Sequence, residues 1–232
     1  QVPLATPPRG GPLARLLGGG GSQQAMADNG DAAVARGKAA AARHDRFNLF
    51  TIPPLVLLTG LSLLCPCEAM HSALSWSVLA YIVADIIYNI LVPHCQPGPV
   101  RLATILVHHL LTAWLVLHPI AYAENGHFTA YCSIVEVNTV CQVFYKVTKL
   151  KIFQMGFMLT WFSMRLIWFP YLIFVFHRTM VQQDQSTYTY CQVVGSQVLL
   201  VGLNVFWSAE QALINRRAAQ PGREDGAKAK ET

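Results

Sequence analysis

Long apolar segments alternate with short polar connections along most of this chain. From Arg46 onward, six of these segments are long enough, at ~1.5 Å of rise per residue, to cross a hydrocarbon core of about 30 Å as helices. They cover residues 49–67, 73–93, 101–122, 128–146, 152–176 and 191–213. Pro170 lies in the fifth segment, where it removes a backbone donor and is expected to kink the outer end. The pattern predicts an all-α, polytopic transmembrane helical bundle of about six spans.

The two ends of the chain differ from this middle part. Residues 1–46 are rich in Gly, Ala and Pro and hold few aromatic or branched side chains, so they are predicted to form a disordered tail. Residues 47–215 form the predicted transmembrane domain. Residues 216–232 alternate in charge and are predicted to be a flexible cytoplasmic tail.

Composition supports the membrane assignment, because 53% of the residues are hydrophobic and only 12% are charged. The net charge of +5 comes from basic residues in short groups beside the apolar segments, not from one patch. That distribution argues against a nucleic-acid partner. Membrane lipids are therefore the expected partners.

Basic residues fall in alternate connections between the segments. Arg43 precedes the first segment and Arg101 lies between the second and third. Lys146 lies between the fourth and fifth, and Arg216 follows the sixth. The other connections contain no Lys or Arg except Arg178. Since short basic loops are retained on the cytoplasmic side, this pattern predicts six spans with both termini cytoplasmic.

Polar side chains interrupt the apolar segments at a few positions. Exposing Asp or Arg to lipid at a helix centre is unfavourable by ~2.5–3.5 kcal/mol, so these groups are expected to face the bundle interior and to pair. We interpret five of them as a polar, lipid-binding pocket: Asp85, Asn89, Asn138, Arg165 and Asn204. The alternative interpretation is that such groups only tie helices together by hydrogen bonds.

Two adjacent histidines, His108 and His109, and the carboxylate of Glu136 are the candidate catalytic residues. An imidazole serves as a general acid or base near neutral pH, and a carboxylate such as Asp85 or Glu136 would fix its tautomer. Because neighbours on a helix point about 100° apart, one histidine is expected to act while the other orients or packs.

These residues together resemble the TLC-domain family, which groups the translocating-chain-associated, longevity-assurance and ceroid-lipofuscinosis membrane proteins. The resemblance covers about residues 75–213. It rests on Asp85 before a Pro-ended helix, the His108-His109 pair, the group that begins at Glu136, and Arg165 near the middle of the fifth segment.

Within this family the ceramide synthases carry a His-Asp and then a Ser-Asp after the histidine pair. Here those positions are occupied by Val135-Glu136 and Asn138-Thr139. The chain is therefore more similar to the short TLC-domain-containing proteins.

The resemblance implies two functions of different class. The first is a role in phospholipid or sphingolipid homeostasis through the polar pocket, in an intracellular membrane such as the endoplasmic reticulum. The alternative is an acyl-CoA-dependent N-acyltransferase acting on sphingoid bases, in which His108 or His109 accepts the proton of the amine or takes the acyl group. Acyl-CoA would then be a substrate, and no cofactor is expected.

A proton-coupled transporter is a third alternative, because buried Asp, Glu, His and Arg also form proton relays. No metal site is predicted, since the histidines form none of the closely spaced boxes of membrane di-iron oxygenases. A disulfide among Cys65, Cys67 and Cys191 is conceivable on the non-cytoplasmic side, although free thiols are expected.

Overall fold

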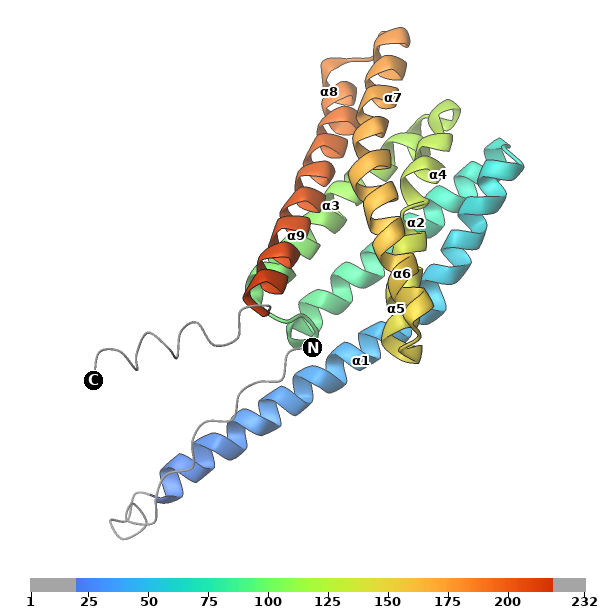
Figure 1. Ribbon diagram of the computed structural model, residues 1–232. Coiled ribbons are helices and arrows are strands. Elements are labelled where there is room, and N and C mark those ends of the chain that lie inside the picture. Colours follow the sequence, from blue (N-terminus) through green and yellow to red (C-terminus); the bar gives the residue numbers. More distant parts are fainter. Residues whose placement is uncertain (1–19, 219–232) are drawn as a thin grey trace. The chain divides into compact units, whose positions relative to one another are not determined.

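The computed structural model describes residues 20–218, which are helical almost throughout and contain no strand (Figure 1). The elements in chain order are α1 (Gly20–Leu64), α2 (Glu68–Leu91), η2 (Pro93–Cys95), α3 (Pro99–Ala121), η3 (Ala123–Asn125), α4 (His127–Ser133), α5 (Glu136–Thr148), α6 (Lys151–Thr160), the π-helix η4 (Trp161–Trp168), α7 (Phe169–Gln182), α8 (Thr187–Tyr190), the π-helix η5 (Cys191–Gly195) and α9 (Ser196–Ala218).

The chain divides into two units. Residues 38–205 form one unit, which contains every group discussed below. The described parts of the other unit are the beginning of α1, residues 20–37, and the end of α9, residues 206–218, and both are helical. Residues 1–19 and 219–232, which belong to the tails predicted for residues 1–46 and 216–232, lie outside the described residues.

Five helical segments within residues 20–218 are long and apolar enough to cross a membrane: Val34–Leu64, Glu68–Leu91, Pro99–Ala121, Lys151–Gln182 and Thr187–Arg216. Large apolar side chains are exposed on their outer faces, such as Phe50 at 75%, Leu110 at 60% and Phe174 at 59%. Surfaces of this kind suit hydrocarbon and not water. The prediction of an all-α, polytopic membrane bundle is confirmed.

The fourth predicted segment, 128–146, is not one helix but the pair α4 and α5. Ile134 and Val135 separate the two in a turn held by bonds such as Val137 N–H to Ile134 O at 3.2 Å. Branched side chains at Ile134, Val135, Val137 and their neighbours weaken helix propensity here. The break makes Glu136 the first residue of α5.

The first helix begins well before the predicted boundary at residue 46. Ala40 is only 1% exposed, and His44 contacts α2, so this part of the chain belongs to the packed unit. A stretch of alanines and glycines masked the start of this helix, because it carries little apolar periodicity.

Pro170 is accommodated without ending the fifth span. It occupies the first turn of α7, where its missing N–H is tolerated, and η4 precedes it as a stretch of wider helical turns. Arg165 lies within η4. The widened turns therefore set the direction of this guanidinium.

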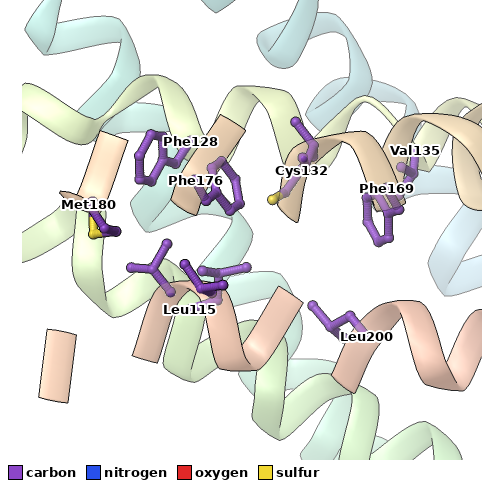
Figure 2. Packing of buried hydrophobic residues seen from close by; sticks show 11 residues of the cluster. Leu115, Phe128, Cys132, Val135, Phe169, Phe176, Met180 and Leu200 are labelled. Carbon is purple, nitrogen blue, oxygen red and sulfur yellow. The ribbon is translucent and has the colours of Figure 1, made fainter. Parts of the chain in front are cut away.

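Two apolar clusters fill the interior. The larger joins α3, α4, α7, η5 and α9, and Figure 2 shows its Phe128 against Phe176, whose ring centroids are 4.3 Å apart. The smaller joins α1, α2, α3 and α4 and includes Leu55, Leu74 and Val116. The polar groups of the candidate site lie beside the boundary between these clusters.

Candidate functional site

Asp85 of α2 is the centre of a buried ionic group, and only 2% of it is exposed. Its Oδ1 lies 2.6 Å from Nε2 of His44 on α1, and its Oδ2 lies 2.9 Å from Nε2 of His109 on α3. The Nδ2 amide of Asn89, one turn later on α2, donates to the same Oδ2 at 2.9 Å. We call these four residues, His44, Asp85, Asn89 and His109, the Asp85 cluster.

A stripe on α1 places His44 against α2. Ala40, His44 and Phe47 follow one another at helical spacing, and so do the α2 residues that they meet. The imidazole of His44 stacks on Tyr88 at 5.0 Å, and the hydroxyl of Tyr88 donates to the carbonyl of Ala40 at 3.2 Å. These contacts orient the His44 imidazole toward the Asp85 carboxylate.

The connection after α2 closes the other end of the Asp85 cluster. Gln96 Nε2 donates to Oδ1 of Asn89 at 2.8 Å, which turns the Asn89 amide nitrogen toward Asp85. The Cys95 thiol also donates to Asn89 Oδ1, at 3.6 Å. Burial, reinforced by the negative charge of Asp85, raises the pKa of the Cys95 thiol, so it stays protonated and acts as a donor.

A small cavity of about 50 Å³ adjoins the Asp85 cluster. His108 and His109 of α3 and Glu136 of α5 line it, so the three candidate catalytic residues share one space. Its remaining walls are mainly apolar and come from both clusters: Leu55 and Val116 belong to the smaller one, and Phe169 and Leu200 to the larger one. A cavity of this size has room for water-sized groups only.

The two adjacent histidines differ in their surroundings although both reach the cavity. Their ring centroids are 5.5 Å apart and the ring planes meet at 77°. His109 makes the contact with Asp85. Because an ionised carboxylate only accepts hydrogen bonds, Nε2 of His109 donates to Asp85, and in the neutral form of the ring Nδ1 is then an acceptor.

Glu136 reaches the cavity because α5 begins at this residue. A carboxylate in the first turn of a helix interacts favourably with the helix dipole. The side chain is partly buried, and it lines the cavity together with His108, His109 and its neighbours Ser133 and Val135.

A second polar group surrounds Arg165, which is 7% exposed. Its Nε donates to Oδ1 of Asn138 at 3.2 Å and its Nη1 to Oδ1 of Asn204 at 3.0 Å. The guanidinium lies over the ring of Trp161, 5.0 Å from the centroid. We call Asn138, Arg165 and Asn204 the Arg165 cluster.

The amide of Asn138 also ties α5 to the fifth span. Its Nδ2 donates to the carbonyl of Phe157 at 2.8 Å and to Oγ1 of Thr160 at 3.0 Å. Trp168, three residues after Arg165, donates from Nε1 to the carbonyl of Tyr131 at 2.9 Å.

The structure thus divides the residues predicted to form one pocket into two groups. Asp85 and Asn89 lie behind His109, next to the cavity, whereas none of Asn138, Arg165 and Asn204 lines it. Arg165 therefore does not line the cavity that His109 reaches. Its hydrogen-bond partners are the side-chain amides of Asn138 and Asn204, and its guanidinium lies over the ring of Trp161.

His44 is the residue that sequence reasoning missed. It lies within residues 1–46, for which the composition predicts a disordered tail without tertiary contacts. The available signal was its spacing, since His44 lies four residues after Ala40 and four before Asn48, on the face that α1 presents to α2.

Comparisons with known proteins give one match. A family model described as the TLC domain matches residues 62–210, which is more than half of the chain. No curated protein and no solved structure matches the chain. Asp85 and His109 lie inside the matched range, whereas His44 lies before it.

Proposed function

Because this chain belongs to the TLC-domain family of membrane proteins, we propose that it acts in membrane lipid homeostasis by binding the small polar group of a lipid inside its helical bundle. The observation that carries this proposal is the carboxylate of Asp85, which two imidazoles share next to a cavity lined by His108, His109 and Glu136. Ionisable groups inside a membrane bundle are unfavourable unless paired and typically mark a site.

The Asp85 cluster supports binding through the proton arrangement of His109. With Nε2–H directed at Asp85, the neutral imidazole keeps an acceptor for an amine, amide or hydroxyl proton of the ligand. Glu136, which lines the same cavity, accepts a second such proton or pairs with an ammonium group. Together they favour a ligand that donates hydrogen bonds.

The volume of the cavity limits the ligand further. About 50 Å³ accepts an amine, hydroxyl or carbonyl group but not a phosphodiester headgroup. A sphingoid base or another lipid with a small polar end fits this description better than a phospholipid. The hydrocarbon part of the ligand has to lie elsewhere.

Orientation and location are part of the same proposal. The connection between α2 and α3 and the connection between α5 and α6 lie at one end of the bundle, and the connections after α1, α3 and α7 lie at the other (Figure 1). Arg101 lies in the first turn of α3, and Lys149 lies between α5 and α6. Short basic connections are retained in the cytoplasm. We place the Asp85 cluster toward the cytoplasmic face of an intracellular membrane such as the endoplasmic reticulum.

A second candidate function is N-acylation of a sphingoid base, and the His109–Asp85 pair is what favours it. A carboxylate that fixes an imidazole is the usual partner of a general base. In that reaction the amine nitrogen attacks the thioester carbon of acyl-CoA, the C–N bond forms, and the C–S bond breaks. His109 takes the proton of the amine and CoA leaves as the thiolate.

Lipids that co-purify with the protein test the first proposal. The wild-type protein, purified in mild detergent, is expected to carry a long-chain lipid with a small polar end, identified by mass spectrometry. His109→Ala is expected to lower its amount by about tenfold, corresponding to ~1.4 kcal/mol. His177→Ala removes an exposed histidine that contacts Tyr190 and is the matched control.

The same proteins separate the two candidate functions when they are supplied with acyl-CoA and a sphingoid base. If the wild-type protein forms the amide and His109→Ala does not, the function is acyl transfer and not lipid binding alone. An identical lipid content in wild type, His109→Ala and His177→Ala contradicts the proposed site.

A further inference from the structure

An open groove of about 420 Å³ runs along the outside of the bundle between α1 and α2. Phe47, Phe50, Pro54 and Leu58 form its α1 wall, and Ala80 and Ala84 form part of the α2 wall. The two alanines leave space where the surrounding outward positions of α2 carry larger side chains, such as Val83 and Ile87. The groove is therefore a depression in an otherwise filled outer surface.

The position of the groove fixes the chemistry of what surrounds it. Its α2 residues, 77–84, lie in the middle of the span Glu68–Leu91, and its α1 residues lie within the span Val34–Leu64. At that depth the neighbouring molecules are the hydrocarbon chains of lipids. Water and headgroups lie nearer the ends of both helices.

Side-chain hydroxyls in the groove are already satisfied by their own helices. Thr51 Oγ1 donates to the carbonyl of Phe47 at 2.9 Å, and Ser77 Oγ donates to the carbonyl of Ala73 at 2.7 Å. Neither hydroxyl therefore needs a hydrogen-bond acceptor on a ligand. An apolar chain can lie along these walls without leaving a polar donor unsatisfied.

Leu55 and Tyr81 belong both to this groove and to the interior cavity. Leu55 is 8% exposed and packs in the smaller apolar cluster. The hydroxyl of Tyr81 donates to Oδ1 of Asn48 at 3.1 Å, and its ring stacks with Phe47 at 6.1 Å. These two side chains separate the lipid-facing groove from the space that contains His108, His109 and Glu136.

We propose that the α1–α2 groove binds the hydrocarbon chain of the lipid whose small polar end occupies the interior cavity, with Leu55 and Tyr81 as the gate between the two spaces. This inference rests on the proposed function and deepens it. The cavity of about 50 Å³ is too small for a chain, whereas a volume of about 420 Å³ falls in the ~300–1,000 Å³ range of small-molecule sites.

Photocrosslinking tests the groove directly. The full-length protein is reconstituted in phosphatidylcholine vesicles with a sphingosine that carries a diazirine in its chain, irradiated, and mapped by mass spectrometry. Labelling is expected to concentrate in residues 47–58 and 77–84 and to be competed by unlabelled sphingosine. Lipids that merely surround the protein compete poorly and label every outward face.

A pair of alanine substitutions on α2 provides the matched variants. Ala80→Trp fills the groove from its exposed wall and is expected to lower the competable labelling by more than about tenfold, because the indole displaces several buried methylenes. Ala73→Trp makes the same change at an exposed position of α2 that lines neither space, and should leave labelling unchanged. Thermal unfolding of both variants verifies that they fold.

The outcomes distinguish this inference from the proposed function. Labelling that is spread over all spans, or that Ala80→Trp leaves intact, overturns the groove even if lipid still co-purifies in a His109-dependent way. Competable labelling that Ala80→Trp abolishes supports the groove, also where the lipid content turns out not to depend on His109. In that last case only the role of the interior cavity fails.

Discussion

The Asp85 cluster and the Arg165 cluster occupy the same bundle but differ in chemistry. Asp85 shares one carboxylate between two titratable rings from other helices, whereas Arg165 donates to two neutral amides. His109 of the Asp85 cluster lines the interior cavity, whereas no residue of the Arg165 cluster lines that cavity. The Arg165 guanidinium has its hydrogen bonds to amides, while the Asp85 carboxylate orders an imidazole that lines the cavity.

This difference distinguishes two interpretations of the buried polar residues, a binding pocket and hydrogen bonds that only join helices, which the sequence alone does not distinguish. Interhelical hydrogen bonds account for the Arg165 cluster, which joins α5, η4 and α9. The Asp85 cluster also joins three helices, but it orders His109 at the wall of the cavity. The Arg165 cluster should therefore respond mainly in stability and the Asp85 cluster mainly in ligand binding.

The largest expected effect is that of Arg165→Ala on stability. The two asparagine oxygens lose their donor and a large side chain leaves a cavity, so unfolding should become easier by about 3 kcal/mol. Equilibrium unfolding in mixed detergent micelles measures this. Arg165→Lys keeps the charge but not the planar fork, and should fall between wild type and Arg165→Ala.

The lipid content of Arg165→Ala sharpens the comparison. Normalised to folded protein, it should equal that of wild type, because Arg165 does not line the cavity. If the bound lipid instead disappears while the folded fraction is unchanged, the Asp85 cluster and the Arg165 cluster belong to one binding site.

Asp85→Asn comes next and should act on binding. The amide keeps the shape of the carboxylate but cannot accept protons from both His44 and His109, so one imidazole must change its tautomer. Co-purifying lipid is expected to fall about tenfold, or ~1.4 kcal/mol. Lipid mass spectrometry at equal protein concentration measures the change.

Asp45→Asn is the matched control for this substitution. Asp45 pairs with Lys146 at 2.6 Å on the exposed surface, where ion pairs contribute little. The lipid content should therefore not change. Equal losses in Asp45→Asn and Asp85→Asn would show that the effect is not specific to the buried carboxylate.

The sequence predicts the helical bundle, the family and the buried polar residues, because apolar length and the exclusion of charge from lipid act locally. It does not predict which polar residues meet. The break between α4 and α5 brings Glu136 to the cavity, and the π-helical turns of η4 direct Arg165 toward Asn138 and Asn204. Both depend on packing between helices, which residue spacing in a single regular helix cannot express.

The same limit explains His44. Its segment has little apolar periodicity, and contacts with another helix show that α1 is packed there: the burial of Ala40, the stacking of His44 on Tyr88 and the bond to Asp85. The boundary predicted from composition therefore lies too late in the sequence.

His44→Phe tests whether the Asp85 cluster needs a residue outside the matched range 62–210. Phenylalanine preserves the aromatic stacking on Tyr88 but removes the bond to Asp85. A lost hydrogen bond of ~0.5–1.5 kcal/mol corresponds to a loss of about two- to twelvefold in retained lipid. His44→Gln keeps one N–H donor and should recover part of it. If His44→Phe retains as much lipid as wild type, the part of the Asp85 cluster that matters for binding lies on α2 and α3 alone.

Trp161→Leu should give the smallest effect, and on stability alone. Its ring lies under the guanidinium of Arg165, and removal of a cation–π contact is expected to cost about 0.5–1 kcal/mol without changing the lipid content. Phe162→Leu at the adjacent, 59% exposed position is the control and should be close to neutral. A loss in Trp161→Leu as large as that in Arg165→Ala would mean that the ring, and not the two amides, holds the cation. In that case the hydrogen bonds from Arg165 to the two amides would not explain how the buried cation is stabilised, and the two clusters would differ for another reason.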